Sequence, residues 1–181
     1  MRRIVLVFSL LLLAGSVRAE TPLAALNGGW SGSGSDRATP FQTLQPAQCR
    51  MQINASATRL NSTSTCDGAG GLKKELKMAV TFSGSEFAGT VEQVSRQGSS
   101  EPTVYSGKIT GQRTGDRAEL TATFPGFTPT VYVSLELTSQ TAMAMKVTTL
   151  GATLTDVTYQ RPGSARQETR APHQARRGHQ D

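Results

Sequence analysis

A two-residue alternation of apolar and polar side chains, which recurs from residue 49 to residue 160, most constrains how this chain can fold. Successive side chains of a β-strand point to opposite faces of the sheet, so the alternation indicates strands with one buried and one exposed face. About ten such segments follow one another, separated mainly by short connections rich in Gly, Ser and Pro. The pattern predicts an antiparallel meander of short strands.

A meander of this length has two exposed edges unless its first and last strands pair. Closure removes both edges, which otherwise invite pairing with other chains. The exposed face is rich in Ser, Thr, Lys and Glu, whereas a membrane-spanning barrel carries its apolar residues outside. We therefore predict an all-β fold, an antiparallel up-and-down meander closed into a small soluble barrel of about 8–10 strands over residues 28–161, followed by a flexible C-terminal tail.

The only tryptophan, Trp30, lies in a glycine-rich stretch at the start of the predicted barrel. A buried indole N–H needs a hydrogen-bond partner, and the neighbouring glycines allow other segments to approach closely. We predict that Trp30 plugs one end of the barrel. The alternative is a buried tryptophan beside an ordinary glycine-rich turn.

Residues 1–19 have the composition of a secretory signal peptide. Arg2 and Arg3 form its positive start, and the apolar run that follows is too short to anchor the chain in a bilayer. The small residues that end at Ala19 predict cleavage after this residue and a periplasmic or secreted location. No later stretch has the length and apolar character of a transmembrane helix.

The chain has two cysteines, Cys49 and Cys66, and an even pair in an exported protein predicts a disulfide bond. Both cysteines lie in a predicted hairpin with a turn near residues 56–59. If they pair directly across the hairpin, Met51 lies opposite Ser64 and shares a face with Cys49. The disulfide then joins the two strands near the open end of the hairpin.

The formal net charge of +6 comes mainly from the two ends of the chain. The signal peptide carries three arginines and residues 162–181 form a basic tail, which we predict to be disordered, so residues 20–161 are nearly neutral. A nearly neutral barrel does not favour nucleic acid as a partner. Residues 20–27 are predicted to be an N-terminal arm, and residues 36–47, with two prolines, a loop.

No combination of residues in the sequence indicates catalysis or a cofactor. The only histidines, His173 and His179, lie in the tail, so the barrel has no histidine to act as a base or a metal ligand. Asp116 and Glu119 fall near a predicted turn, where solvated carboxylates are expected rather than a catalytic pair. We therefore expect a protein that is not an enzyme and binds no cofactor or metal.

Several apolar residues on the predicted inward face are candidates for a ligand pocket. Methionine adapts its shape readily, so several methionines together can line a pliable apolar pocket. The alternative is ordinary core packing. The predicted lining residues are Met51, Met78, Val133, Leu135 and Met145.

The sequence Gly28-Gly29-Trp30 resembles the motif Gly-x-Trp, where x is any residue, at the start of the calycin barrels. These barrels include lipocalins, avidins and fatty-acid-binding proteins. In lipocalins this tryptophan packs against a late basic residue, and the resemblance implies that Arg161 has this role here. The chain resembles small exported calycin-like barrels of the kind seen as uncharacterised proteins in alphaproteobacteria. It also resembles periplasmic metalloprotease inhibitors, small barrels with one disulfide and an arm that enters the protease cleft.

Together these features predict an exported, non-enzymatic β-barrel that binds a small apolar or amphipathic ligand in its interior. Two alternatives remain open at the level of sequence. The first is a protein-binding inhibitor, whose interior is filled and whose N-terminal arm projects from the barrel. The second is an envelope protein that only interacts with other surface components.

Overall fold

The structure is a computed structural model that describes residues 22–162, apart from the side chains of residues 127 and 128. The predicted signal peptide and almost all of the predicted tail lie outside these residues. The described part contains ten strands and two short 3₁₀ helices. In chain order they are η1 (Leu23–Leu26), β1 (Gly28–Asp36), β2 (Gln45–Ala55), β3 (Arg59–Gly68), η2 (Ala69–Gly71), β4 (Leu72–Ser83), β5 (Glu86–Gln97), β6 (Thr103–Thr114), β7 (Arg117–Phe124), β8 (Phe127–Ser139), β9 (Ala142–Thr149) and β10 (Ala152–Gln160).

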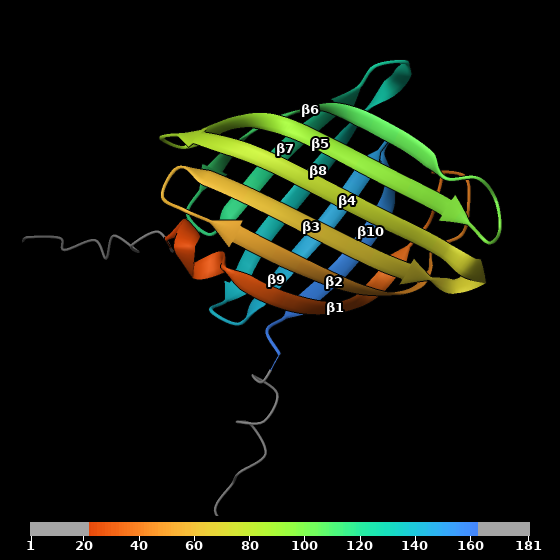
Figure 1. Cartoon of the computed structure of the whole chain (residues 1–181), viewed down its shortest axis with the longest axis horizontal. Helices are drawn as coiled ribbons and strands as arrows, with labels where there is room; N and C mark the ends of the chain where they lie inside the picture. Colours follow the sequence, from red (N-terminus) through yellow and green to blue (C-terminus); the bar gives the residue numbers. More distant parts are fainter. Residues whose placement is uncertain (1–21, 163–181) are drawn as a thin grey trace, which may run out of the picture.

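The ten strands form one closed antiparallel barrel in which each strand pairs with its neighbours in the sequence (Figure 1). The pairing of β1 with β10 closes the barrel, from Ser31 opposite Gln160 to Asp36 opposite Thr155. The predicted all-β, up-and-down barrel is therefore confirmed, at the upper end of the predicted range of strands. Closure leaves no strand of the described chain with an unpaired edge.

The barrel has two different ends, which Figure 1 shows on the left and right. We call the end at which β1 begins the tryptophan end; η1 and the turns that follow β2, β4, β6 and β8 lie there. We call the opposite end the loop end; it carries the segment 37–44 and the connections that follow β3, β5, β7 and β9. This division determines which side chains meet inside the barrel.

The core fills the inside of the barrel and follows the alternation seen in the sequence. Each of the ten strands contributes at least one buried apolar side chain. Along β2, for example, every second residue from Ala47 to Ala55 is buried, and the residues between them are exposed. Because the burial period equals the period of side-chain direction in a strand, the sequence pattern identifies the inward face correctly.

The disulfide between Cys49 and Cys66 is present, in the predicted register. The two residues are direct partners of β2 and β3, with their Cα atoms 4.1 Å apart, and Met51 lies opposite Ser64. Both half-cystines are buried inside the barrel. The bond therefore joins two neighbouring strands from within the core.

The predicted loop over residues 36–47 is wrong at both of its ends. Asp36 is the last residue of β1, and Gln45, Pro46 and Ala47 already belong to β2. Pro46 is tolerated because it lies at the beginning of the strand, where proline is compatible with β-structure. The actual loop, 37–44, is shorter than predicted, and Asp36 becomes part of the barrel interior.

Two glycines of β1 allow β10 to lie against it. A Cβ atom on Gly34 would lie 2.0 Å from the backbone oxygen of Asp156, and one on Gly32 would lie 2.7 Å from the ring of Tyr159. Real side chains do not tolerate such distances, so any larger residue would push the two strands apart. The glycine-rich sequence of β1 is thus a requirement of barrel closure.

Removal of the disulfide should destabilise the barrel without changing its fold. The bond closes a loop with a sequence separation of 17 residues, and a loop of this size contributes about 3 kcal/mol in the chain-entropy description. The double variant Cys49→Ala/Cys66→Ala should therefore lose about 3 kcal/mol of unfolding free energy in urea denaturation. Reductant should lower the stability of the wild type and leave the variant unchanged. Equal unfolding midpoints of the oxidised wild type and the variant would contradict this account.

Candidate functional site

Trp30 lies buried at the tryptophan end, against the guanidinium group of Arg161. The indole Nε1 donates a hydrogen bond to the backbone oxygen of Leu26 at 3.0 Å. The central guanidinium carbon of Arg161 lies 4.6 Å from the centre of the Trp30 ring, within the range of a cation–π interaction. Arg161 also donates a hydrogen bond to the backbone oxygen of Ala25. Both side chains therefore hold η1 across this end of the barrel.

The described part of the N-terminal arm lies on the barrel and does not project from it. Leu23 is buried and belongs to the core. The side-chain amide of Asn27 forms two hydrogen bonds with the backbone of Ala55 at the end of β2. Its Nδ2 donates to the Ala55 oxygen at 2.8 Å, and its Oδ1 accepts from the Ala55 N–H. The arm is thus fixed over the tryptophan end by side-chain bonds as well as by packing.

Behind η1 lies an apolar cavity with a volume of about 70 Å³, which we call the tryptophan-end cavity. Its charged lining residues come from the β6–β7 hairpin and from the end of β8: Arg113, Asp116, Arg117 and Glu136. Its apolar lining comes from η1 and seven strands: Leu23, Leu26, Met51, Ile53, Leu60, Met78, Val80, Phe82, Phe87, Ala118, Leu120, Leu135, Leu137 and Met143. Ser62 is the remaining lining residue, so most of the wall is apolar.

A second cavity of about 60 Å³ lies in the other half of the barrel, and we call it the loop-end cavity. Val133 and Met145 line it, and Met51 and Leu135 line the tryptophan-end cavity. Met78 lines both cavities and therefore lies between them. Each of the five residues predicted to line a pocket thus borders one cavity or both.

The interior is more filled than hollow. An apolar cavity of about 150 Å³ binds a molecule of the size of benzene, whereas the two cavities have volumes of about 70 and 60 Å³. Each can take a few non-hydrogen atoms as it stands. Four of the five methionines line these cavities, and flexible methionine side chains give the walls room to rearrange.

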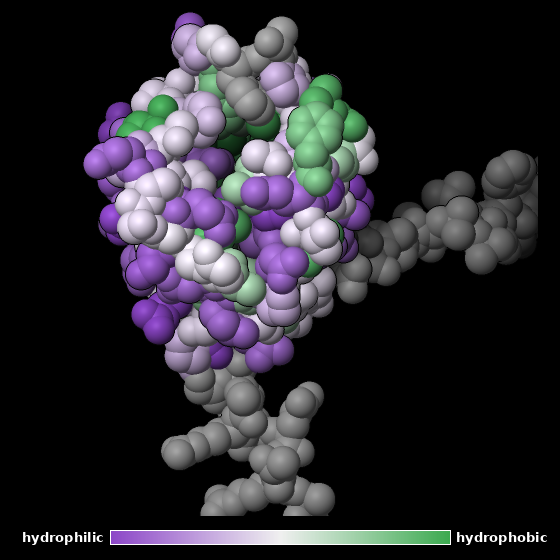
Figure 2. Space-filling model, turned by 90° about the vertical axis from the view of Figure 1, so that its right-hand side faces the viewer, coloured by the Kyte–Doolittle hydropathy of each residue, from purple (hydrophilic) through white to green (hydrophobic). Residues whose placement is uncertain are grey.

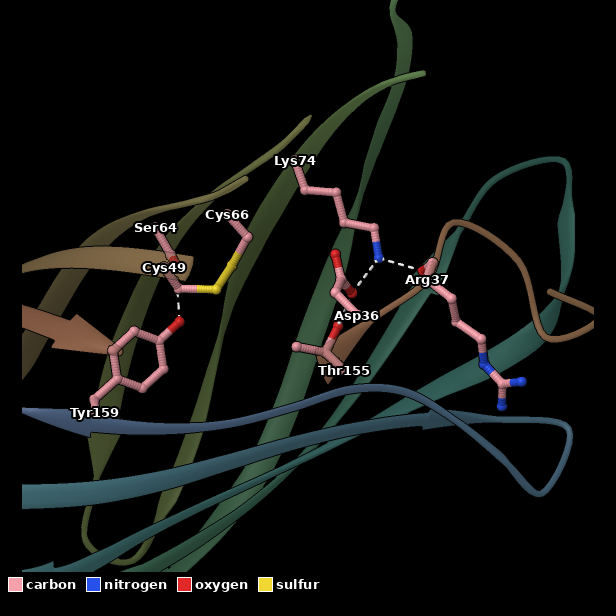
Figure 3. Close-up of a disulfide and its surroundings, with 8 residues drawn as sticks. All are labelled: Asp36, Arg37, Cys49, Ser64, Cys66, Lys74, Thr155 and Tyr159. Carbon is pink, nitrogen blue, oxygen red and sulfur yellow. Dashed lines mark hydrogen bonds and ion pairs between the residues drawn. A yellow bond between two sulfur atoms is a disulfide. The ribbon is translucent and has the colours of Figure 1, made fainter. Parts of the chain in front are cut away.

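The loop-end cavity contains a buried ion pair, which is drawn in Figure 3. The Lys74 ammonium donates to Oδ1 of Asp36 and to the backbone oxygen of Arg37, both at 2.6 Å. The hydroxyl of Thr155 donates to the same Asp36 oxygen at 2.7 Å. Asp36 is fully buried. This cluster therefore joins the end of β1, the beginning of β4 and the middle of β10 inside the barrel.

Burial shifts the pKa values of two groups inside the barrel. It lowers the pKa of Lys74 from its ordinary value of 10.5, and the negative charge of Asp36 opposes this shift only in part. Burial also raises the pKa of Tyr159 above 10.0. The Tyr159 hydroxyl lies 3.1 Å from Oγ of Ser64, close enough for a hydrogen bond. Tyr159 therefore stays neutral at physiological pH, and its polar end has a partner.

The sequence analysis did not identify Asp36 and Lys74 as a pair, although the signal was present. Lys74 is two residues before Leu76, so both side chains point to the inward face of β4. Asp36 is six residues after Trp30 in β1, and this even spacing places its side chain on the same inward face as that of Trp30. A charged residue at an inward position needs a partner. The inward positions of Asp36 and Lys74, which have opposite charges, therefore made them candidates for a buried ion pair.

The structure also places the acidic residues that the sequence analysis considered. Residues 22–162 contain no group of three or more His, Cys, Asp or Glu side chains that could hold a metal ion. Asp116 lies in the β6–β7 turn, and Glu119 forms an exposed ion pair with Arg117. In the same part of the chain no helix is long and apolar enough to cross a membrane.

Comparison with known proteins assigns the chain to no group. No protein-family model matches it, and no curated protein matches it significantly.

Replacement of Trp30 should be among the most destabilising single changes. Trp30 is only 2% exposed and packs against both Arg161 and η1, and truncation of a buried aromatic side chain to alanine costs about 3–5 kcal/mol. Trp30→Ala should lose this amount of unfolding free energy, measured by circular dichroism in urea. The control is Tyr132→Ala, because Tyr132 is 55% exposed. If both variants lost the same small amount, Trp30 would not be a structural plug.

Proposed function

We propose that this chain is an exported, calycin-like binding protein that takes the apolar part of a small molecule into the tryptophan end of its barrel and catalyses no reaction. The observation that carries the proposal is the tryptophan-end cavity, whose walls are apolar and whose charged residues come from one hairpin and the end of β8. Binding sites for small molecules combine such apolar walls with a few polar groups. An amphipathic ligand would keep its polar part near those charged residues or meet the polar groups deeper in the barrel.

The size of the cavity limits the ligand to a slim apolar group. A volume of about 70 Å³ admits part of an alkyl chain more readily than a ring system. A longer chain requires Met78 to move, because this residue lies between the two cavities. Methionine is suited to such movement since its side chain is unbranched and flexible.

The disulfide supports the proposed location. Such bonds persist in oxidising compartments and are rare in the cytosol, where thiols are kept reduced. The Cys49–Cys66 bond is buried in the core and joins paired strands. A structural bond of this kind agrees with export of the chain, with cleavage proposed after Ala19.

The inhibitor alternative receives no support from the described part of the arm. Leu23–Leu26 lies on the tryptophan end and helps to line the cavity, so it is not free to enter a protease cleft. A function in protein binding has one favourable observation at the loop end, where Phe41, Val104 and Leu150 are exposed. Figure 2 views this end and shows hydrophobic residues separated by hydrophilic ones. Scattered apolar residues of this kind are common on protein surfaces.

Methionine methyl groups provide a direct test of the proposed site. Met51 and Met143 line the tryptophan-end cavity, so ¹³C-methyl labelling of methionine places reporters at the site. Addition of 1-fluorohexane to the mature protein should shift these two resonances in a saturable way. The variant Ala118→Leu fills the cavity and should weaken binding at least about tenfold, which corresponds to 1.4 kcal/mol.

The matched control is Ala79→Leu, which adds the same atoms to the exposed face of β4. This variant should bind 1-fluorohexane as the wild type does. Absence of saturable shifts in the wild type, or equal affinity of the Ala118→Leu variant, would contradict the proposed function.

A further inference from the structure

One oxygen of the buried Asp36 carboxylate has no hydrogen-bond partner. Oδ1 accepts from both Lys74 and Thr155, whereas no group among the described residues donates to Oδ2, which is buried. Buried polar atoms are nearly always bonded, because an unsatisfied one costs much of its hydration free energy. Since Asp36 is fully buried and lines the loop-end cavity, Oδ2 marks a place where a donor from outside the chain would be stabilised.

The loop-end cavity has room for such a donor. Its volume of about 60 Å³ exceeds the space that one water molecule needs. Its polar lining residues are Asp36, Ser64, Lys74, Gln93 and Thr155. Most of its other walls are apolar and include Met78, Val133 and Met145. The cavity therefore combines an acceptor with apolar surroundings, as expected for the site of a small polar group on an apolar molecule.

The charges around Oδ2 favour a neutral donor. Asp36 and Lys74 form a pair of opposite charges that are almost completely buried. An ammonium group at Oδ2 would add a third buried charge without compensation, and a carboxylate would face the negative charge of Asp36. Burial already lowers the pKa of Lys74, which shows that this environment disfavours positive charge. A hydroxyl group satisfies the acceptor and adds no charge.

We infer that the loop-end cavity is a recognition site for a neutral hydrogen-bond donor on the ligand, above all a hydroxyl group, with Oδ2 of Asp36 as the acceptor. The inference rests on the proposed function, which places the apolar part of the same ligand in the barrel. Met78 lines both cavities, so movement of this one side chain would connect the hydroxyl site with the tryptophan-end cavity. The ligand class that fits is a slim neutral amphiphile, such as a primary alcohol with an unbranched chain.

A series of probes with one tail and different head groups tests the inference on the wild-type protein. The probes are 1-hexanol, 1-fluorohexane, hexylammonium and hexanoate, titrated into protein with ¹³C-methyl-labelled methionine. Met145 lines only the loop-end cavity of the two, and its methyl resonance reports on the head group. We expect 1-hexanol to bind about tenfold more tightly than 1-fluorohexane, as befits a hydrogen bond to a charged acceptor. Both charged probes should bind more weakly than 1-hexanol.

The outcomes separate this inference from the proposed function. Equal affinities for 1-hexanol and 1-fluorohexane would overturn the hydroxyl site, because only water would then donate a hydrogen bond to Oδ2. This result would leave the proposed apolar site intact. Stronger binding of hexylammonium would also overturn it, in favour of a cation site. Failure of every probe to bind would contradict the proposed function itself.

Two variants locate the effect at Asp36. Asp36→Asn replaces the charged acceptor with a neutral amide, which forms only an ordinary hydrogen bond with a hydroxyl group, so it should reduce the preference for 1-hexanol over 1-fluorohexane. The control is Asp156→Asn, which makes the same substitution on the exposed face of β10, away from the cavity, and this variant should keep the preference. An undiminished preference in Asp36→Asn would contradict the assignment. If Asp36→Asn does not fold, the comparison of probes on the wild type still decides the question.

Discussion

The pairing of β1 with β10 is the interaction on which the rest of the structure depends. It closes the sheet, and Gly32 and Gly34 make it possible by leaving room for the residues of β10. Closure also brings together residues that are distant in the sequence: the start of β1 meets the end of β10, so Trp30 lies under Arg161, and the end of β1 brings Asp36 to Thr155. Without this pairing the chain would have two exposed edges and neither end of its interior would be formed.

The two halves of the interior differ in their buried charges. The tryptophan end is covered by η1 and its cavity is lined mainly by apolar residues, whereas the loop-end cavity has the ion pair of Asp36 and Lys74 in an otherwise mostly apolar lining (Figure 3). A buried ion pair adds little stability relative to apolar packing, because both charges lose their hydration. The Asp36–Lys74 pair lies beside the loop-end cavity. Since it adds little stability, we interpret it as part of the proposed binding site. Under the proposed function, the same difference would give a bound molecule a defined direction in the barrel.

The features that could be predicted from the sequence are those that depend on the local geometry of a single strand or hairpin. Side-chain direction alternates in every strand, so the inward face, the strand count and the register of Cys49 with Cys66 could be predicted without knowing the barrel. The ion pair could not be predicted with the same certainty, because Asp36 and Lys74 lie on strands that are not neighbours in the barrel and meet only across its interior. Cavity volume depends on the packing of Met78 and its neighbours, which no pattern of residue types determines. The end of the loop was misplaced at Pro46 because proline also occurs at the beginning of strands.

Native mass spectrometry of the protein, purified from the periplasm or medium of its own host, the proposed location, tests the central claim most directly. The account predicts a species heavier than the polypeptide by one small molecule, which denaturation releases, and this molecule should be slim, largely apolar and carry a hydroxyl group. The Ala118→Leu variant, purified in the same way, should have lost most of it. Wild-type protein that carries only its polypeptide mass, and takes up no such molecule when one is supplied, would contradict the claim that the barrel is a binding protein.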